Sequence, residues 1–316
     1  MADIIKTATR DAYGKALIEL GKKNDKVVVF DADLAAATKT GMFKKEFPER
    51  FIDCGIAEGN MMGVAAGMAT AGYTVFASSF AMFAAGRAFE QVRNTICYPH
   101  LNVKIGATHA GISVGEDGAS HQCCEDIALM RSIPGMTILN PADDVEARLA
   151  VMAAAEMEGP CYMRFGRLAV PRIFDENYKF EIGKGVYLKE GKDVTIIASG
   201  LLVERALQAA ELLKAEGIDA AVINMATIKP IDRDIIIDAA KKTGAIVTAE
   251  EHSVIGGLGG AVSEVICETV PVPVLRVGVE DKFGKSGPAL ELLEIFGLNA
   301  ANICEKAKAA IALKNN

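Results

Sequence analysis

Two segments of the sequence carry residues whose types and spacing suit chemistry, and the first centres on Glu58. In DCGIAEGNMMGVAAGMA this glutamate follows an expected strand and precedes a helix with almost no other polar side chain. A first-turn glutamate can simply complement the helix dipole. Alternatively, an apolar setting desolvates the carboxyl group, so that it can hold or donate a proton near neutral pH. Helix position alone does not choose between these two interpretations.

The second segment is KIGATHAGISVGEDGASHQCCED, residues 104–126, which follows another expected strand. It places His109, His121, Glu116 and Asp117 among small residues that would let a ligand approach the backbone. The histidines are twelve positions apart and lack a helical His-x-x-x-His spacing, so a zinc site is a weak alternative. A polar surface loop is another. Ligand binding is favoured, because loops at the carboxyl ends of parallel strands form binding sites.

Phenylalanines are concentrated between these two segments, in FASSFAMFAAGRAFEQVRN. Most of these rings are expected in the core, but one that flanks a pocket could stack on a planar heterocycle. A glycine cluster, Gly256–Gly260, lies farther along between a strand and a helix, as a phosphate-binding turn would. Its spacing fits neither the dinucleotide fingerprint nor the P-loop, so close packing of the strand and helix is the better explanation.

The composition limits the class of protein. The chain of 316 residues is 51% hydrophobic and 24% charged, which predicts an ordered protein of about two domains. The net charge of -7 argues against binding to nucleic acid or to a membrane surface, since such binding surfaces are usually basic. Seven cysteines without a Cys-x-x-Cys pair predict reduced thiols in a cytoplasmic protein. The vicinal pair Cys123 and Cys124 is expected to be inert.

The run from Gly59 to Gly86 contains no charged residue and is long enough to cross a bilayer. It is rich in Ala, Gly, Met and Ser, and Gly72-Tyr73-Thr74 interrupts it. We therefore expect the buried centre of an α/β domain. The N-terminal residues mix acids with bases and lack the apolar core of a secretory signal, so a domain is expected to begin there.

Short apolar runs alternate with amphipathic segments along the chain, which predicts parallel sheets with crossover helices. The predicted fold class is α/β, with two doubly wound domains at residues 1–175 and 191–316 and a polar linker at 176–190. In the first domain, strands are expected over residues 27–31, 51–54, 74–77, 103–107, 136–140 and 161–165, and a helix over 143–157. In the second, strands are expected over residues 194–199, 220–224, 245–249 and 274–277, with helices over 204–216, over 231–242 and after Gly260.

Taken together, these segments resemble transketolase, and more narrowly its C-terminal half. ATHAGISVGEDGASHQ resembles the family segment A-T-H-D-S-I-G-x-G-E-D-G-P-T-H-Q over its whole length. IAEGNMMGVAAGMA resembles the segment with the family's cofactor-activating glutamate, and SSFAMFAAGRAFEQVR resembles its aromatic cofactor-binding segment. ATRDAYGKAL, FDADL, RFGRLAVP, EEHSVIGGLGG and VEDKFGKSG fit the same order. The resemblance covers essentially the whole chain and implies a pyrimidine-binding domain followed by a transketolase C-terminal domain.

The resemblance implies thiamine diphosphate and Mg²⁺ as cofactors, and it implies roles for five residues. Glu58 would be catalytic, because it would hydrogen-bond and so activate the aminopyrimidine ring of the cofactor. Phe83 would stack on that ring, Phe80 would line the same pocket, and Asp33 would lie at the contact between cofactor and subunits. His121 would be the second catalytic residue, placed near the reacting carbonyl for polarisation or proton transfer.

The substrate-binding residues also follow from the resemblance. Asp117 matches the residue that reads a sugar hydroxyl group. Arg10, His109 and Arg167 match the phosphate-binding group, in which a guanidinium fork suits the oxygens of a phosphate. Arg164 is a weaker substitute for Arg167.

Two features depart from the family pattern. The usual serine in the loop after the cofactor-contacting aspartate falls at Ala37, so a phosphate contact is lost or shifted. The Gly-Asp-Gly motif that holds the magnesium diphosphate in thiamine enzymes is absent, and Gly115-Glu116-Asp117-Gly118 belongs to the other motif. The resemblance therefore implies one subunit of a split transketolase without metal ligands of its own. It also implies a partner chain with Gly-Asp-Gly, self-association within a heterotetramer, and sugar phosphate substrates.

Other interpretations stay open. Halves of deoxyxylulose-phosphate synthase and 2-oxoacid dehydrogenase beta subunits share the architecture and an equivalent glutamate, although the segment from His109 to His121 favours transketolase. A non-catalytic regulatory subunit could keep the same fold, but the retained Glu58 and Asp117 argue against it. A nicotinamide dehydrogenase is weaker, because the dinucleotide fingerprint is missing.

Overall fold

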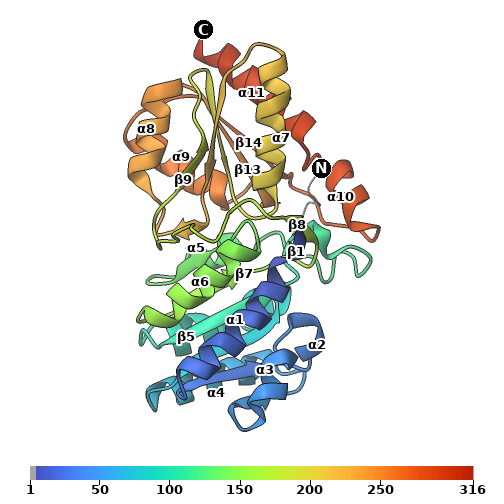
Figure 1. Ribbon diagram of the computed structural model, residues 1–316, viewed down its shortest axis with the longest axis vertical. Coiled ribbons are helices and arrows are strands. Elements are labelled where there is room, and N and C mark those ends of the chain that lie inside the picture. The colour runs from blue at the N-terminus through green and yellow to red at the C-terminus, as the bar shows by residue number, and fades with distance from the viewer. Residues whose placement is uncertain (1–4, 316) are drawn as a thin grey trace.

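Two largely parallel sheets, one from each half of the chain, form the framework of the structure (Figure 1). This computed structural model describes residues 5–315; residues 1–4 and 316, at the outer ends of the two predicted domains, lie outside that range. The first sheet and its helices, blue to green, lie below the second, which is coloured yellow to red. The expected α/β class with parallel sheets is confirmed.

The first sheet has seven strands in the order β12-β6-β7-β5-β4-β2-β3. Neighbouring strands are parallel, except that β12 is antiparallel to β6. All six strands predicted for the first domain are present: β2 (Val27–Asp31), β3 (Phe51–Asp53), β4 (Thr74–Phe80), β5 (Val103–Thr108), β6 (Thr137–Leu139) and β7 (Cys161–Arg164). β4 continues past the predicted end at Ala77, because residues 78–80 pair with residues 106–108 of β5. The buried Ser78 hydroxyl is hydrogen-bonded to the Tyr13 hydroxyl at 2.6 Å, so this polar side chain is tolerated in the core.

Helices cover both faces of the first sheet. α1 (Thr9–Lys23) and α6 (Asp144–Glu156) pack on one face around the buried Tyr13 and Leu17. The other face is covered by α4 (Glu58–Thr70), η2 (Met82–Arg87), η3 (Gln91–Cys97) and α5 (Asp126–Arg131). α6 begins close to its predicted start, because Asp143 caps it by accepting a hydrogen bond from the Glu146 amide at 2.8 Å. The connections contain α2 (Ala35–Thr38), α3 (Gly41–Glu46), η1 (Pro48–Arg50) and η4 (Ile112–Val114).

The second sheet has the order β14-β13-β10-β11-β9. Its parallel strands, all expected from the sequence, are β10 (Val194–Ala198), β11 (Ala220–Asn224), β13 (Ile246–Ser253) and β14 (Val274–Val279). α7 (Leu202–Ala215) and α11 (Ala300–Lys314) pack on one face. α8 (Arg233–Thr243) and α9 (Leu258–Glu268) pack on the other, and α10 (Ala289–Ile295) lies against η4.

Four short strands are not predicted by the alternation of the sequence. β1 (Lys6–Ala8) pairs with β8 (Ala169–Pro171), close to the junction of the two sheets in Figure 1. β9 (Val186–Lys189) lies inside the segment 176–190 that was expected to be an irregular linker, and it pairs with β11. β12 (Thr227–Lys229) comes from the second half of the chain, yet it extends the first sheet. The positions of the domain boundaries stay a prediction.

The charge-free run folds into α4 and β4 at the centre of the first domain. Met61 and Met62 of α4 are fully buried. Within residues 5–315, no helix combines the length and the apolar character that crossing a bilayer demands. All seven cysteines are free, and burial raises the pKa of both Cys123 and Cys124, which disfavours the reactive thiolate.

Candidate active site

The predicted site residues gather at one edge of the first sheet, where its parallel strands end. β2, β3, β4 and β5 all end at this edge. The segments that follow these four strands carry Asp33, Glu58, Phe83 and His109, with Asp117 and His121 farther along the last segment. Residues that are far apart in the sequence are therefore presented together, as ligand sites in parallel sheets require.

Glu58 lies at the start of α4, and its carboxyl group is almost completely buried, with 1% of the residue exposed. Arg87 donates hydrogen bonds from Nη1 to both carboxylate oxygens, at 3.1 Å to Oε1 and 3.0 Å to Oε2. The arginine side chain is 51% exposed, so the pair joins a buried anion to a cation at the surface. Sequence reasoning assigned no role to Arg87.

The turn that carries Arg87 is a π-helix, η2, closed by a hydrogen bond from the Ala88 amide to the Phe83 carbonyl at 3.3 Å. This wide turn places the Arg87 guanidinium over the Phe83 ring, 4.5 Å from the ring centroid. A cation at this distance is attracted by the ring face. Single π-turns occur frequently at functional sites.

Two phenylalanines and two histidines form a continuous aromatic group beside Glu58. The rings of Phe80 and Phe83 are stacked with centroids 6.1 Å apart. His109 stacks on Phe80 at 3.8 Å, and His121 meets Phe83 edge-on at 5.3 Å. Phe80 is buried, whereas Phe83 is only partly buried. The structure therefore brings these four predicted site residues into direct contact.

Arg10 and His109 are joined directly, although 99 positions separate them. Because an arginine cannot accept a hydrogen bond, Arg10 Nη1 donates to His109 Nε2, at 2.8 Å. The proton of the neutral ring then lies on Nδ1, which donates to the Thr108 hydroxyl at 2.9 Å. Arg10 Nη1 also donates to the Ala37 carbonyl at 3.0 Å, while its buried Nε finds no partner within residues 5–315.

His109 is held in its neutral form. Burial lowers the pKa of His109 to about 3, and the neighbouring charges of Arg10, Arg167 and Lys39 act in the same direction. A ring that accepts from an arginine and stacks on Phe80 can orient a ligand, but it carries no positive charge for a phosphate at neutral pH. The charge expected in the phosphate-binding group must come from the arginines.

This low pKa of His109 predicts an acid-dependent stability. An ordinary histidine pKa of about 6.5 applies to the unfolded chain, so the unfolded state alone binds this proton between about pH 6.5 and 3. The free energy of unfolding therefore keeps the full contribution of the neutral His109 above about pH 6.5. It decreases by about 1.4 kcal/mol for each pH unit as the pH falls below that value. Urea unfolding of the wild type and of His109→Gln at pH 7, 6 and 5 measures it. The free energy of unfolding of His109→Gln should depend less on pH than that of the wild type. Equal pH dependence of the two proteins would contradict the low pKa assigned to His109.

Arg167 fastens the loop that carries Asp117. It donates to the Val114 carbonyl and, at 3.0 Å, to Glu116 Oε2. Both carboxylates of the loop are exposed, so Asp117 is free to meet a ligand that enters from solvent. Burial lowers the pKa of Arg10, and the charge of Arg167 acts in the same direction. The Gly166 amide donates to the Thr9 hydroxyl at 2.9 Å, so the residues that follow them, Arg167 and Arg10, lie on the same side of the site.

Arg164, the weaker candidate for the phosphate-binding group, is buried, which agrees with its lower ranking. Its side chain is 3% exposed and donates from Nε to Asp126 Oδ2 at 2.8 Å. Its Nη2 donates to the carbonyls of Cys123 and Glu251, at 3.2 and 2.9 Å. These hydrogen bonds hold the guanidinium group in the junction between the two domains, so it is not available to a phosphate. Arg167 is the better candidate because its side chain is 39% exposed.

Asp33 lies at the edge where the subunit contact was expected, after β2. It adopts a left-handed backbone with φ of 61°, an uncommon conformation that aspartate tolerates better than most residues. The Asp33 amide donates a hydrogen bond to Asp53 Oδ1 at 3.1 Å, and Asp33 itself is exposed. Ala37 of the same loop offers no side-chain hydrogen bond, so Arg10 instead engages its main-chain carbonyl.

A cavity of about 520 Å³ opens next to the aromatic group. Phe83 and Arg87 line the cavity together with Ser120 and Gln122 of the segment 104–126. The second domain closes the cavity with Lys282, Phe283 and Gly284. Gln122 Nε2 donates to the Lys285 carbonyl at 2.9 Å, which fixes the loop of the second domain to the predicted site segment. Both domains therefore contribute to the walls of the cavity.

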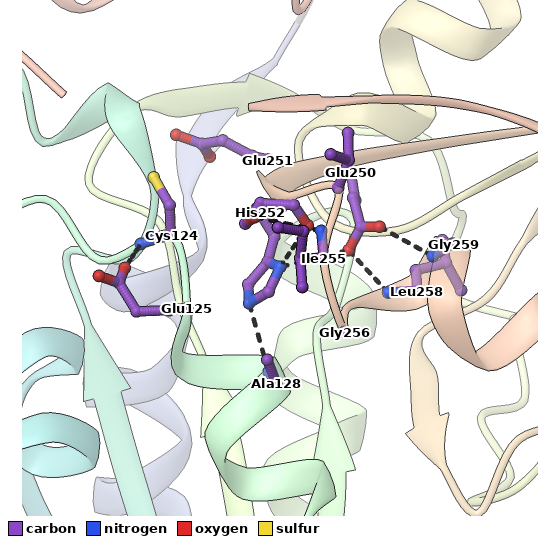
Figure 2. A network of polar contacts seen from close by, with 12 residues as sticks. Cys124, Glu125, Ala128, Glu250, Glu251, His252, Ile255, Gly256, Leu258 and Gly259 are labelled. Carbon is purple, nitrogen blue, oxygen red and sulfur yellow. Dashed lines mark hydrogen bonds and ion pairs between the residues drawn. The ribbon is translucent and has the colours of Figure 1, made fainter. Parts of the chain in front are cut away.

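The second domain also contacts the site segment through buried polar groups, some of which Figure 2 shows. Glu251 Oε1 accepts a hydrogen bond from the Ser113 amide at 2.6 Å, in the loop that leads to Asp117. The Ala128 amide donates to His252 Nε2 at 3.3 Å, which joins α5 to β13 (Figure 2). The sequence pattern assigned no part in the site to the second domain, because these residues are far from the motif.

The glycine cluster Gly256–Gly260 does not offer free amides to a phosphate. Glu250 accepts hydrogen bonds from the amides of Leu258 and Gly259, at 2.7 and 2.8 Å (Figure 2). This carboxylate occupies the N-terminus of α9, where a bound anion would otherwise be stabilised. A Cβ atom at Gly257 would lie 2.0 Å from Glu250 Oε2. The expected explanation, close packing of a strand against a helix, agrees with this geometry.

Comparison with known proteins identifies the family. Residues 5–172 match the pyrimidine binding domain of transketolase, and residues 183–303 match the transketolase C-terminal domain. The chain belongs to the transketolase family. It is 54% identical over 300 residues to the putative transketolase C-terminal section of Methanocaldococcus jannaschii, covering 94% of each chain. It is 45% identical over 306 residues to a 6-deoxy-6-sulfo-D-fructose transketolase subunit of a Clostridium species, covering 97% of this chain and 95% of that one.

A solved structure supports the same placement within transketolase. It is described as a split-gene transketolase in an inactive β4 tetramer, and it superposes with a TM-score of 0.90 at 56% identity. The match covers 97% of this chain and 99% of that one. The chain therefore corresponds to the C-terminal section of transketolase.

The candidate site has two features that suit a planar heterocycle, such as the pyrimidine end of thiamine diphosphate, the cofactor of the transketolase family in general. A partly buried aromatic ring, Phe83, faces a cavity, and a buried carboxyl group, Glu58, lies beside it. A planar heterocycle needs such a ring face and a hydrogen-bonding group at its edge. No group of three or more His, Cys, Asp or Glu side chains in residues 5–315 is arranged to hold a metal ion.

Proposed function

We propose that the chain is the C-terminal subunit of a thiamine-diphosphate-dependent transketolase that moves a two-carbon ketol unit between sugar phosphates. The observation that carries the proposal is the convergence of Glu58, Phe80, Phe83 and His121 at one sheet edge beside a cavity. When bound, the cofactor supplies the nucleophile for breaking and forming the carbon–carbon bond. The residues of this chain bind it, orient it and handle protons.

The contacts of Glu58 and His121 support the role proposed for each. The buried Glu58 carboxyl would share a proton with the aminopyrimidine ring, and Phe83 would provide the face on which that ring could stack. His121 is half-buried against Phe83, and its Nδ1 is 3.0 Å from the Ser120 hydroxyl, which orients the imidazole. The other ring nitrogen is available to polarise a carbonyl or to move a proton at a substrate hydroxyl.

The substrate phosphate would meet Arg10 and Arg167. Arg10 has a buried Nε without a partner among the described residues, so an incoming oxygen could accept a charge-assisted hydrogen bond there. Asp117, exposed on the neighbouring loop, would accept a hydrogen bond from a sugar hydroxyl. The relative from Clostridium acts on 6-deoxy-6-sulfo-D-fructose by its name. The identity of the sugar here is therefore a separate question from the class of reaction.

A partner chain with the Gly-Asp-Gly motif would hold the diphosphate and Mg²⁺. The absence of this motif from the sequence supports that proposal, as does the near-complete coverage of two relatives described as a section and a subunit. We propose a symmetric heterotetramer with two copies of each chain, since closed symmetry is the usual arrangement of soluble oligomers. The half-exposed Arg87 and the exposed Asp33 lie on the edge available to such a partner.

The test is reconstitution. The chain is purified alone and together with the Gly-Asp-Gly chain, and both samples receive thiamine diphosphate and Mg²⁺. Ketol transfer between sugar phosphates is expected only from the mixture. Turnover by this chain alone would overturn the split arrangement. If the mixture instead uses pyruvate with glyceraldehyde phosphate, or a 2-oxoacid with lipoamide, the related thiamine enzymes replace transketolase. Failure of the mixture to bind cofactor would indicate a regulatory subunit.

Arg10 also gives a prediction about substrate recognition. Arg10→Ala is expected to lower kcat/KM for phosphorylated substrates by about 10–100-fold, because a charge-assisted hydrogen bond is worth about 1.5–3 kcal/mol. An unphosphorylated substrate should be affected little. Steady-state kinetics with both substrates measures the difference, and Arg233→Ala, a surface ion-pair residue on α8, is the matched control. Equal losses for the two substrates would remove Arg10 from the phosphate site.

A further inference from the structure

A single arginine side chain covers both groups that the cofactor would need. Arg87 Nη1 lies 3.1 and 3.0 Å from the two carboxylate oxygens of Glu58. Its guanidinium carbon lies 4.5 Å from the centroid of the Phe83 ring. Arg87 also lines the cavity beside that ring. The hydrogen-bonding group and the stacking face are therefore engaged at the same time by one side chain.

The two ends of this ion pair differ in freedom. Glu58 is 1% exposed, whereas the Arg87 side chain is 51% exposed and extends from a π-turn. After release the half-exposed guanidinium can take other rotamers and donate to water. An ionised Glu58 left behind would be buried without a counter-charge, so release requires a proton or a ligand at the carboxyl group. The buried carboxyl group cannot move away without disrupting α4. Arg87 is thus the partner that would move.

The charge state of the pair opposes the proposed chemistry. A guanidinium bound to both oxygens stabilises the ionised carboxylate. Activation of the aminopyrimidine requires instead that Glu58 carry a proton that it can share with the ring. An arginine in this position therefore competes with cofactor both for space and for the proton.

We propose that Arg87 is a positioning residue that acts as a latch, meaning that it holds Glu58 and covers Phe83 until the cofactor displaces it. This inference rests on the proposed function, because it assumes that Glu58 contacts the aminopyrimidine. The latch keeps the buried carboxylate paired in the unloaded chain and makes cofactor affinity depend on how often the pair is open. If the site is open in only a fraction of the molecules, the apparent Kd equals the Kd of the open site divided by that fraction.

The experiment measures cofactor affinity rather than turnover. Thiamine diphosphate is titrated calorimetrically, at saturating Mg²⁺, into the complex of this chain with the Gly-Asp-Gly chain. Arg87→Ala is expected to tighten binding by about tenfold if the latch is closed in about nine molecules of ten. Arg87→Lys, which keeps the charge but loses the fork, should tighten it by about threefold. Arg93→Ala is the control, because Arg93 is exposed on the adjacent π-turn and bonds Asn94.

The outcomes separate the latch from the proposed function. Tighter binding by both Arg87 variants with unchanged binding by Arg93→Ala supports the latch. Unchanged or weaker binding by the Arg87 variants, with normal binding by the wild type, overturns the latch and leaves the proposed function intact. If Arg87→Ala does not assemble by gel filtration, Arg87→Lys decides alone. No binding by the wild-type complex would overturn both proposals, since the latch requires the cofactor.

Discussion

Glu58→Gln is expected to lower kcat of the reconstituted two-chain enzyme by about 10²–10⁴-fold, the range usual for loss of a positioned acid–base group. Glutamine has the size of glutamate and can still accept a hydrogen bond from Arg87, so the fold and the assembly should persist. It cannot share an acidic proton with the aminopyrimidine ring. The loss should therefore appear in kcat, while KM for the sugar phosphates changes little.

The burial of Glu58 makes this effect large. The residue is 1% exposed, and its neighbours on α4, Met61 and Met62, belong to the apolar core. Water cannot replace the lost proton donor in such a site, and among residues 5–315 the Glu58 carboxyl group is hydrogen-bonded to Arg87 and not to a second carboxyl group. The expected loss of kcat is therefore large, because no other group can supply the proton that the Glu58 carboxyl group is proposed to share.

The control for this measurement is Glu46→Gln, because Glu46 is an exposed residue at the end of α3. It removes the same charge from the same domain and should leave kcat within twofold of the wild type, or about 0.4 kcal/mol. Gel filtration of both variants with the partner chain verifies assembly. Near-normal turnover by an assembled Glu58→Gln enzyme would refute the role assigned to this residue.

The sequence predicts most of the fold because its strands are strongly patterned. The apolar runs at Val27–Asp31 and Ala220–Asn224 coincide with β2 and β11. The strands that escaped prediction are short, with three or four residues each. β12 has three residues and becomes a strand only because β6 offers an edge to it, and β9 needs β11 in the same way. Such pairing is a tertiary effect that local alternation does not encode.

The sequence predicts those residues of the candidate site that belong to contiguous motifs. His109 and His121 belong to one recognisable segment, and the structure brings both to Phe80. Arg87 lies within a quoted motif, yet its contact with Glu58 depends on a π-turn that spacing rules for ordinary helices do not anticipate. Arg164 was considered for a phosphate because guanidinium groups suit anions, and only burial against Asp126 excludes it.

That buried pair gives the second large expected effect, on stability. Arg164→Met should lower the free energy of unfolding by about 3–5 kcal/mol, because it leaves the Asp126 carboxylate buried without its counter-charge. The guanidinium also donates to the Glu251 carbonyl at 2.9 Å, so its loss should loosen the junction between the two domains. Urea denaturation at pH 7 measures the change. Arg233→Met removes an exposed pair with Glu268 and should cost about 0–1 kcal/mol.

The pH dependence of this effect distinguishes a charge from mere packing. Burial alone would raise the pKa of Asp126, but the charge and hydrogen bond of Arg164, with help from Tyr162, outweigh burial and lower it below its usual value. The stabilisation is therefore present above the unfolded-state pKa of about 3.9 and is lost as the pH falls through the lower folded-state value. The difference between wild type and Arg164→Met should shrink in strong acid. Asp126→Leu combined with Arg164→Met should recover much of the loss at pH 7, because it removes both buried charges. A difference that is constant with pH, or a double variant as unstable as the single one, would assign the effect to packing.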